Sequence, residues 1–92
     1  MIRSFADRAT RQSWATEKSK AYGQFARVAL RKLMQLNAAE QLDDLKMPLG
    51  NRLEGLKGDR LGQYSIRINQ QWRICFVWKE GGACDVEIVD YH

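Results

Sequence analysis

The sequence has few of the residues that build disulfides and metal sites. Its 92 residues include two cysteines, one histidine and one proline. Cys75 and Cys84 do not form a metal-spaced pair, and a single histidine cannot complete a zinc site. No stretch approaches the ~18 apolar residues of a membrane span, and the N-terminus lacks the apolar core of a signal peptide. We therefore expect a cytoplasmic protein with no metal, cofactor or disulfide, in which both cysteines are reduced sheet or core residues.

The length and composition predict one small globular domain. A chain this short has no room for a second domain, so we expect residues 1–92 to form a single unit. Apolar residues make up 45% of the chain, which suits a packed core and argues against disorder. Such a modest core does not enclose a large organic cofactor.

The net charge of +4 is concentrated in the first third of the chain. Residues 1–36 carry a net +6, residues 37–59 a net −2, and residues 60–92 are neutral. A basic surface of this kind follows phosphates and makes binding depend on salt. The alternative is an ordinary solvated helix face. Two arginines of the basic third, Arg27 and Arg31, are predicted to bind RNA. Arg60 and Arg67, in the neutral last third, are predicted to bind it as well.

The first half of the chain has a helical pattern. Apolar residues recur at helical spacing over residues 22–36, and a weaker pattern predicts a helix over residues 7–16. Asn37 followed by Glu40 resembles a capping box and predicts a short third helix. Pro48 then marks the turn that separates this helical half from the strands.

The second half alternates apolar and polar residues, which predicts strands. Alternation with β-branched and aromatic residues covers residues 63–68, 72–78 and 84–89. Residues 52–57 are expected to add a fourth strand, and residues 1–5 an edge strand. Helices followed by an antiparallel meander predict an α+β fold, with two or three N-terminal helices packed on one face of a small antiparallel sheet.

The alternation also predicts how the first two long strands pair. A three-residue loop at residues 69–71 pairs Ile66 with Ile74 and places Arg67 opposite Arg73. A slip by one residue would put Ile66 opposite Arg73, which would mix the two faces. Like charges on a cross-strand pair are destabilising, and such a conflict is more common where an anion is bound. The two arginines are therefore candidate phosphate ligands.

The last hairpin brings the chain end toward these arginines. The same alternation pairs Phe76 with Val86 and puts Cys75 and Cys84 on opposite faces, which argues against a disulfide. The polar face then gathers the groups that cleave RNA without a metal: a base for the 2′-hydroxyl, cations for the phosphate and an acid for the leaving 5′-oxygen. The candidates are Glu54, Lys57, Arg67, Arg73, Asp90, Tyr91 and His92.

These candidates also have purely structural interpretations. The two arginines are also interpretable as solvent-facing strand residues paired with Glu87 or Asp85. His92 is also interpretable as a frayed chain end, and the acids and the lysine as members of local salt bridges or turns. Trp72 and Trp78 lie on the apolar face, which favours the core over an RNA-stacking role.

Two motifs in the strand half are together quite specific: Asn69-x-x-Trp72-Arg73-Ile74 and the ending Asp90-Tyr91-His92. Through them residues 50–92 resemble HigB-type toxins of the RelE/ParE superfamily, which belong to type II toxin–antitoxin systems. Residues 1–49 match these toxins in length and helical character. The resemblance implies the RelE-like microbial RNase fold, in which two N-terminal helices cover one side of a small antiparallel sheet.

The resemblance also implies an activity and partners. It implies a ribosome-dependent mRNA endonuclease that cuts in the A site of the 70S ribosome and leaves a 2′,3′-cyclic phosphate and a 5′-hydroxyl. The implied partners are a HigA-type helix-turn-helix antitoxin, the ribosome with its rRNA, and mRNA. Operator DNA is bound only through the antitoxin complex, and no membrane is involved.

The resemblance assigns roles by position. Lys57 and Arg73 stabilise the scissile phosphate. Glu54 is a departure, because some relatives have histidine there. A glutamate can act as a base but is a poor acid at neutral pH, so the resemblance leaves the roles of base and acid open. The resemblance assigns the positioning of the RNA and the acid–base chemistry to the chain end, which consists of Asp90, Tyr91 and His92.

Two other functions are compatible with the same fold. One is a ParE-like toxin that poisons gyrase by binding, without RNA chemistry. The other is a non-catalytic RNA- or protein-binding module. The set of acids, bases and cations described above speaks against the gyrase binder, since binding alone does not require such a set.

Overall fold

The chain folds with its helices first and its strands last, which confirms the α+β prediction. The computed structural model describes residues 1–16 and 22–90. Its main elements are α1 (Arg8–Thr16), α2 (Ala26–Ala38), β1 (Glu54–Gly55), β2 (Tyr64–Arg67), β3 (Trp72–Lys79) and β4 (Gly82–Asp90). Short 3₁₀ turns join them: η1 (Gly23–Phe25), η2 (Leu42–Lys46), η3 (Leu49–Asn51) and η4 (Gly58–Arg60).

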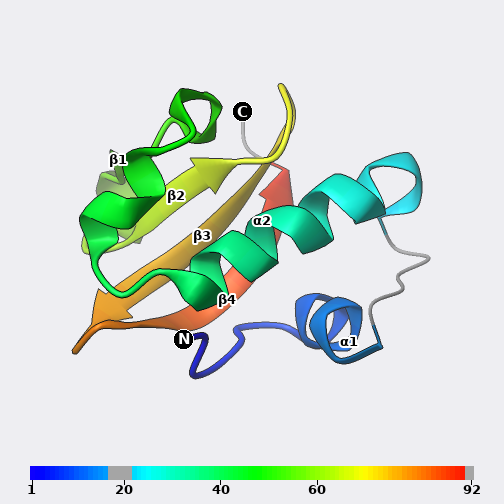
Figure 1. Ribbon diagram of the computed structural model, residues 1–92, viewed down its shortest axis with the longest axis horizontal. Helices are drawn as coiled ribbons and strands as arrows, with labels where there is room; N and C mark the ends of the chain where they lie inside the picture. Colours follow the sequence, from blue (N-terminus) through cyan, green and yellow to red (C-terminus); the bar gives the residue numbers. More distant parts are fainter. Residues whose placement is uncertain (17–21, 91–92) are drawn as a thin grey trace.

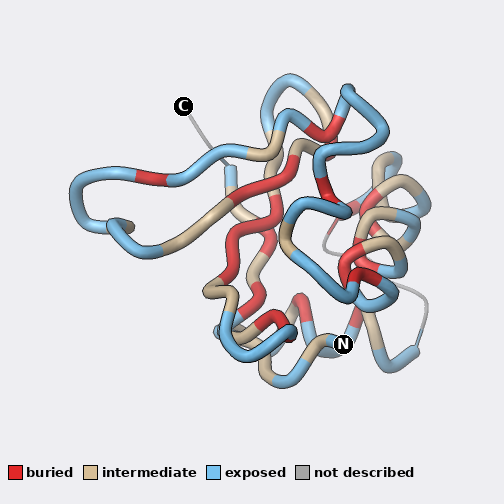
Figure 2. Tube along the Cα trace, turned by 60° about the vertical axis from the view of Figure 1, so that its left-hand side comes forward, coloured by how far each residue is buried: buried red, intermediate tan, exposed pale blue. Residues whose placement is uncertain are grey.

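The described residues form two layers. The strands make one antiparallel sheet in the order β1-β2-β3-β4. α2 crosses one face of this sheet, and α1 lies beside α2 near β4 (Figure 1). Burial is greatest where the strands and the inner side of α2 meet, whereas the connecting loops are exposed (Figure 2). No helix within residues 1–16 and 22–90 is long and apolar enough to cross a membrane.

α2 is amphipathic as the sequence predicts, although it starts later. Ala29, Leu33 and Leu36 are fully buried against the sheet, and they follow helical spacing. The predicted helix over residues 22–36 is divided, because its first turn is the 3₁₀ turn η1. Gly23 has a φ of +50°, a conformation that glycine adopts without steric cost.

The capping box of the third helical segment is displaced from its predicted position. Asn37 lies inside α2, and its Oδ1 accepts a hydrogen bond of 2.9 Å from the Ile2 amide. The segment is the 3₁₀ turn η2, and its cap is formed by Gln41 and Asp44. The Asp44 carboxylate accepts hydrogen bonds from the amides of Glu40 and Gln41, at 2.9 and 3.1 Å. The prediction that Asn37 and Glu40 form the cap was therefore wrong.

The predicted register of the central hairpin is confirmed. Ile66 pairs with Ile74, and Arg67 pairs directly with Arg73. Both isoleucines are fully buried beneath α2, so the apolar face stays intact on both strands. The fourth strand is also confirmed, although β1 is only two residues long.

A bulge in β4 changes the register of the last hairpin. Cys75 pairs with Glu87, but Val77 pairs with Cys84, so β4 contains one extra residue between these pairs. The positive φ of 52° at Asp85 lies within the bulge. Paired residues face the same side of a sheet, so Cys84 faces the same side as Cys75. The predicted pair of Phe76 with Val86, and the opposite orientation of the cysteines, were wrong for this reason. Both thiols are free.

The N-terminal segment covers the outer edge of β4. Ile2 and Phe5 form parallel bridges with β4, and the Arg3 amide donates a 2.7 Å hydrogen bond to the Ala83 carbonyl. Further along the edge, the buried Thr10 hydroxyl accepts a 3.0 Å hydrogen bond from the Ile88 amide. Residues 1–5 thus lie at the sheet edge, but they form two isolated bridges rather than the predicted edge strand, and Thr10 extends the cover by one side chain.

Candidate active site

The sheet face away from α2 carries a row of residues that crosses all four strands. The register aligns Glu54 with Ser65, Ser65 with Cys75, and Cys75 with Glu87. We call these four residues the polar row. Ser65 and Cys75, in its middle, are fully buried, whereas the carboxylates at its two ends are partly exposed. The row therefore has a floor of small residues with an acid at each end.

Arg73 is anchored over this row by three different groups. Its Nε donates a 2.7 Å hydrogen bond to Ser65 Oγ, and its Nη2 donates one of 2.7 Å to the Arg52 carbonyl. The same Nη2 lies 3.5 Å from Glu54 Oε1 in an ion pair. The Arg73 side chain is 12% exposed, while that of Glu54 is 49% exposed. The guanidinium is thus fixed in place, with a more accessible carboxylate beside it.

Arg67 uses a different acceptor from its cross-strand neighbour. Its Nε donates a 3.0 Å hydrogen bond to the Asn69 carbonyl at the end of its own strand. Two like charges on directly paired residues repel. Because each guanidinium hydrogen-bonds to its own acceptors, the repulsion between the two arginines costs less free energy. The sheet therefore holds two arginines side by side on its polar face, as the alternation predicts.

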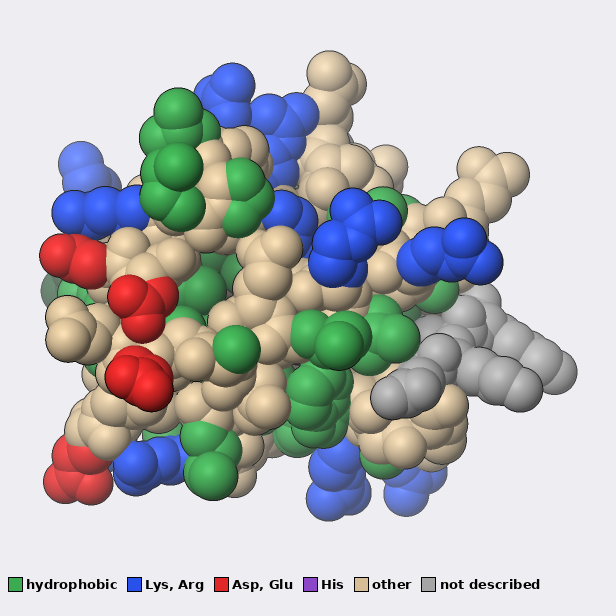
Figure 3. Space-filling model, viewed as in Figure 1, with side chains coloured by type: hydrophobic (Ala, Val, Ile, Leu, Met, Phe, Trp, Pro, Cys, Tyr) green, Lys and Arg blue, Asp and Glu red, His purple; other side chains and the backbone are tan. Residues whose placement is uncertain are grey.

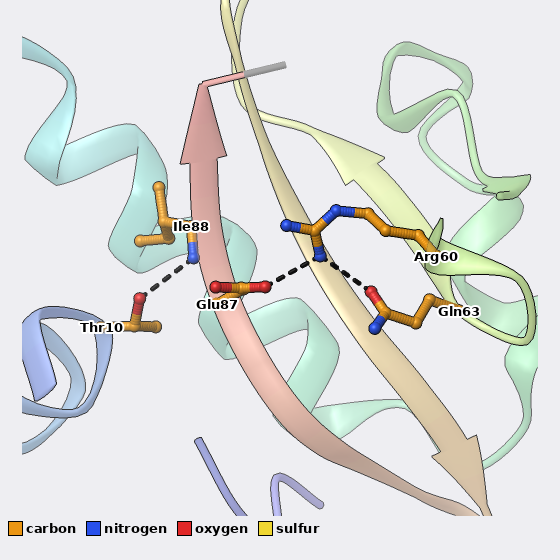
Figure 4. Close-up of polar contacts among 5 residues, drawn as sticks. All are labelled: Thr10, Arg60, Gln63, Glu87 and Ile88. Carbon is orange, nitrogen blue, oxygen red and sulfur yellow. Dashed lines mark hydrogen bonds and ion pairs between the residues drawn. The ribbon is translucent and has the colours of Figure 1, made fainter. Parts of the chain in front are cut away.

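Arg60 reaches the opposite end of the polar row. Its Nη1 lies 2.8 Å from Glu87 Oε1 and donates a 3.0 Å hydrogen bond to Gln63 Oε1 (Figure 4). Lys57 immediately precedes η4 and is exposed. The Lys57 carbonyl accepts a 3.3 Å hydrogen bond from the Arg60 amide, so the lysine and the arginine share one tight turn.

The charges of both ion pairs act on the Cys75 thiol. Burial is the largest cause that raises the pKa of this thiol above its ordinary value. Arg60 and Arg73 oppose the rise, whereas Glu87 and Glu54 add to it. The thiol therefore stays protonated at neutral pH. By register Cys75 lies between Ser65, which accepts from Arg73, and Glu87, which pairs with Arg60.

The chain end differs from the prediction in one respect. Asp90 pairs with Trp72, so by register its side chain lies on the helix-covered side of the sheet rather than with Arg67 and Arg73. Its Oδ2 accepts a 2.9 Å hydrogen bond from Gln71 Nε2. The placement of Asp90 on the polar face was therefore wrong, while its chemical role stays a prediction. Tyr91 and His92 lie outside the described residues.

The predicted RNA-binding arginines fall on two sides of the molecule. Arg27 and Arg31 are exposed on α2, which covers the apolar face. Arg60 and Arg67 belong to the polar face. On the helix-bearing side, basic side chains lie over the N-terminal half of α2, and acidic side chains gather at the far left of the view (Figure 3).

Sequence reasoning missed the residues that hold the arginines. Ser65 and Gln63 are hydrogen-bond acceptors in this site, and Glu87 was considered only as a partner of Arg67 or Arg73. The strand register could have indicated Ser65 as a site residue, because it aligns Ser65 with the candidate residue Glu54 across β1 and β2. Within residues 1–16 and 22–90, no three or more His, Cys, Asp or Glu side chains are grouped so as to hold a metal ion.

Comparisons by sequence give one consistent family. The family model for the RelE-like toxin of the type II toxin–antitoxin system HigB matches residues 3–92. Toxin HigB-1 of Vibrio cholerae is 49% identical over 53 residues, which are 58% of this chain and 56% of the relative. Endoribonuclease HigB of Proteus vulgaris is 34% identical over 61 residues, 66% of this chain and 65% of the relative. The chain thus covers less than two thirds of the length of either relative.

Comparison by structure supports the fold. A chain of the YoeB-YefM complex from Staphylococcus aureus matches with a TM-score of 0.61, and the match covers 100% of this chain and 98% of that chain. The sequence identity is 15%, so the similarity concerns the fold alone. The predicted RelE-like arrangement of helices on one face of an antiparallel sheet is confirmed.

Proposed function

Because this chain belongs to the HigB-like toxin family of type II toxin–antitoxin systems, we propose that it is a ribosome-dependent endoribonuclease that cuts mRNA in the A site. A relative from Proteus vulgaris carries the name Endoribonuclease HigB. The observation that carries the proposal is the anchored guanidinium of Arg73, held by Ser65 and by the Arg52 carbonyl with the Glu54 carboxylate beside it. A fixed cation next to a base is what phosphate-centred chemistry needs.

The reaction proceeds on one phosphate of the mRNA. The 2′-hydroxyl loses its proton to a base, and its oxygen attacks the adjacent phosphorus while the bond from phosphorus to the 5′-oxygen breaks. The leaving 5′-oxygen takes up a proton, which yields a 2′,3′-cyclic phosphate and a 5′-hydroxyl. Arg73 and the exposed Lys57 stabilise the extra negative charge that develops on the phosphate oxygens.

Glu54 is the proposed base. In the free protein its carboxylate lies 3.5 Å from Arg73, in the place where a phosphate oxygen would bind. An incoming phosphate competes for the guanidinium and leaves the carboxylate next to the 2′-hydroxyl. The proton for the leaving oxygen then comes from the chain end, where Tyr91 and His92 are the proposed groups, and Asp90, on the helix-covered side by register, is proposed to position them.

The exposed arginines of α2 serve docking rather than chemistry. Arg27 and Arg31 lie on the helix side, so they cannot share a phosphate with Arg73 across the sheet. We assign them to rRNA, a large polyanion for which several exposed cations are suited. A helix-turn-helix antitoxin of the HigA type, encoded beside this toxin, is the proposed neutralising partner, and operator DNA is contacted through that complex.

The test is cleavage of a translated mRNA, read by primer extension. We expect Arg73→Ala to cleave about 100-fold to 1,000-fold more slowly than the wild type, because one charge-stabilising donor is lost. Lys79→Ala is a matched control that removes one exposed basic residue from the far end of β3. A second variant that lacks His92 tests the chain end.

Three outcomes separate the components of the proposal. Equal cleavage by the wild type and Arg73→Ala, with both proteins folded, would contradict the role of Arg73. Intact mRNA after expression of the wild type would contradict the nuclease activity, and gyrase-dependent DNA breaks in the same cells would indicate a gyrase poison. Cleavage of free mRNA at the rate seen on ribosomes would contradict the ribosome dependence.

A further inference from the structure

Arg60 and Glu87 form the second ion pair of the polar face. The pair is short, at 2.8 Å, and Gln63 adds a second acceptor for the same Nη1 atom. The two charged residues are 27 positions apart in the chain. The Arg60 side chain is 33% exposed and that of Glu87 is 26% exposed, so the pair is partly desolvated but still reachable from solvent.

The ion pair stretches the arginine over the sheet. In Figure 4 the Arg60 side chain extends from the loop after β1 over β3, toward Glu87 on β4. The guanidinium thereby lies at the Glu87 end of the polar row, whereas Arg73 contacts Ser65 and Glu54 toward the other end. Cys75 pairs with Ser65, the acceptor of Arg73, on one side and with Glu87, the partner of Arg60, on the other.

An arginine on a loop does not keep such a position by itself. A long, exposed side chain samples many rotamers, and each phosphate contact must then overcome that freedom. A carboxylate on a β-strand is a fixed point, and an arginine that binds it loses most of this freedom before RNA arrives. The carboxylate also has a cost near RNA, because it repels phosphates unless its partner neutralises it.

We propose that Glu87 is a positioning residue that holds Arg60 on the polar face, so that Arg60 and Arg73 bind neighbouring phosphates of one RNA strand. The inference rests on the proposed nuclease function and adds a second phosphate position to it. Arg60 contributes to RNA binding, and Arg73 to the chemistry. Glu87 touches no RNA and acts through Arg60.

The sign of one substitution distinguishes this role from general electrostatics. Glu87→Gln removes a negative charge and keeps nearly the same shape. If only the overall charge mattered, the variant would bind RNA and ribosomes more tightly. If Glu87 positions Arg60, the variant binds more weakly, although it is more positive.

The experiment measures single-turnover cleavage of mRNA on programmed ribosomes at increasing toxin concentration. We expect Glu87→Gln to raise the toxin concentration for half-maximal rate about threefold, and Arg60→Ala about tenfold, with nearly unchanged maximal rates. Glu80→Gln is the matched control, because it makes the same chemical change on an exposed residue at the end of β3. Thermal unfolding verifies that each variant is folded.

A double substitution tests the coupling. In the Arg60→Ala background Glu87 only repels phosphates, so adding Glu87→Gln should lower the half-maximal concentration rather than raise it. Glu87→Gln therefore weakens binding when Arg60 is present and strengthens it when Arg60 is absent. A merely structural ion pair produces no such reversal of sign.

The outcomes separate this inference from the function it rests on. A folded Glu87→Gln variant that reaches half-maximal rate at the wild-type concentration or below would overturn the positioning role while leaving the nuclease intact. Weaker binding from Glu87→Gln in both backgrounds would overturn it too, since Glu87 would then act without Arg60. A wild-type protein that cleaves no mRNA overturns the proposed function, and the inference falls with it.

Discussion

The two faces of the sheet bury their residues by different means. On the helix side, Phe76 and Ile74 are fully buried under α2, where apolar side chains interlock. On the polar side, Ser65 and Cys75 are just as completely buried, although α2 packs on the opposite face of the sheet (Figure 1). Arg73 hydrogen-bonds to Ser65, and the charges of Arg60 and Arg73 act on Cys75.

This difference shows that burial alone does not identify a core. The long apolar stems of arginines cover small residues while their charged heads remain near water. One face therefore contributes stability through apolar area, and the other holds charges in fixed positions for binding. Variants on the two faces should consequently fail in different assays.

The largest expected effect comes from neighbours in β3 that face opposite sides. Phe76→Ala should lower the free energy of unfolding by about 3–5 kcal/mol, because it leaves a cavity under α2. Cys75→Ala should cost about 1 kcal/mol, since it removes only one sulfur atom from the face opposite α2. Urea denaturation measures both values, and equal costs would contradict the contrast between the two faces.

A smaller effect is expected at the edge of β4. Thr10→Val keeps the shape of the side chain but leaves the Ile88 amide without its acceptor, so unfolding should become easier by about 1–3 kcal/mol. Thr16→Val is the control, because the Thr16 hydroxyl donates to a carbonyl at an exposed position of the same helix. The two variants should differ in the midpoint of thermal unfolding, and a shared midpoint would show that the Thr10 contact is dispensable.

A binding effect without a chemical effect is expected on the helix side. Arg27→Gln combined with Arg31→Gln should raise the toxin concentration for half-maximal cleavage about threefold and make it less sensitive to salt. The maximal cleavage rate should stay unchanged, because neither residue reaches the polar face. Lys46→Gln with Lys79→Gln removes the same charge elsewhere. A similar shift in that control would mean that only net charge matters.

The smallest expected effect concerns the cap of η2. Hydrogen bonds from the Gln41 and Glu40 amides lower the pKa of Asp44 below its ordinary value. The stabilisation they provide is present above the unfolded pKa and is lost as the pH falls through the lowered one. Asp44→Asn should therefore unfold at a slightly lower temperature than the wild type at about pH 7, and the difference should shrink as the pH falls below about 4. A difference that persists in acid would contradict this origin.

Periodicity predicted the parts of the site that lie within one hairpin. The pairing of Arg67 with Arg73 followed from alternation and a short loop, because a slip of one residue would have exposed the apolar face. The partners of these arginines did not follow. Arg60 and Glu87 meet across 27 residues, and no local pattern indicates which carboxylate a loop arginine will reach.

Errors arose where one residue changed the geometry. The extra residue at Asp85 reversed the side that Cys84 faces. A prediction from strict alternation assigns the wrong side to every residue beyond a bulge, because the bulge adds one residue to the strand. The cap moved from Asn37 to Gln41 because α2 runs further than its apolar pattern, and helix ends are weakly specified by sequence.

The sequence by itself determined the α+β class, the central register and the separation of charge between a basic helical third and a neutral strand half. These features depend on side-chain periodicity and composition, which are local. Only the tertiary structure decided which carboxylate holds which arginine, that Asp90 belongs to the helix side, and that Thr10 caps the β4 edge 78 residues away. Such contacts depend on the path of the backbone between distant segments, and a single extra residue in a strand is enough to redirect them.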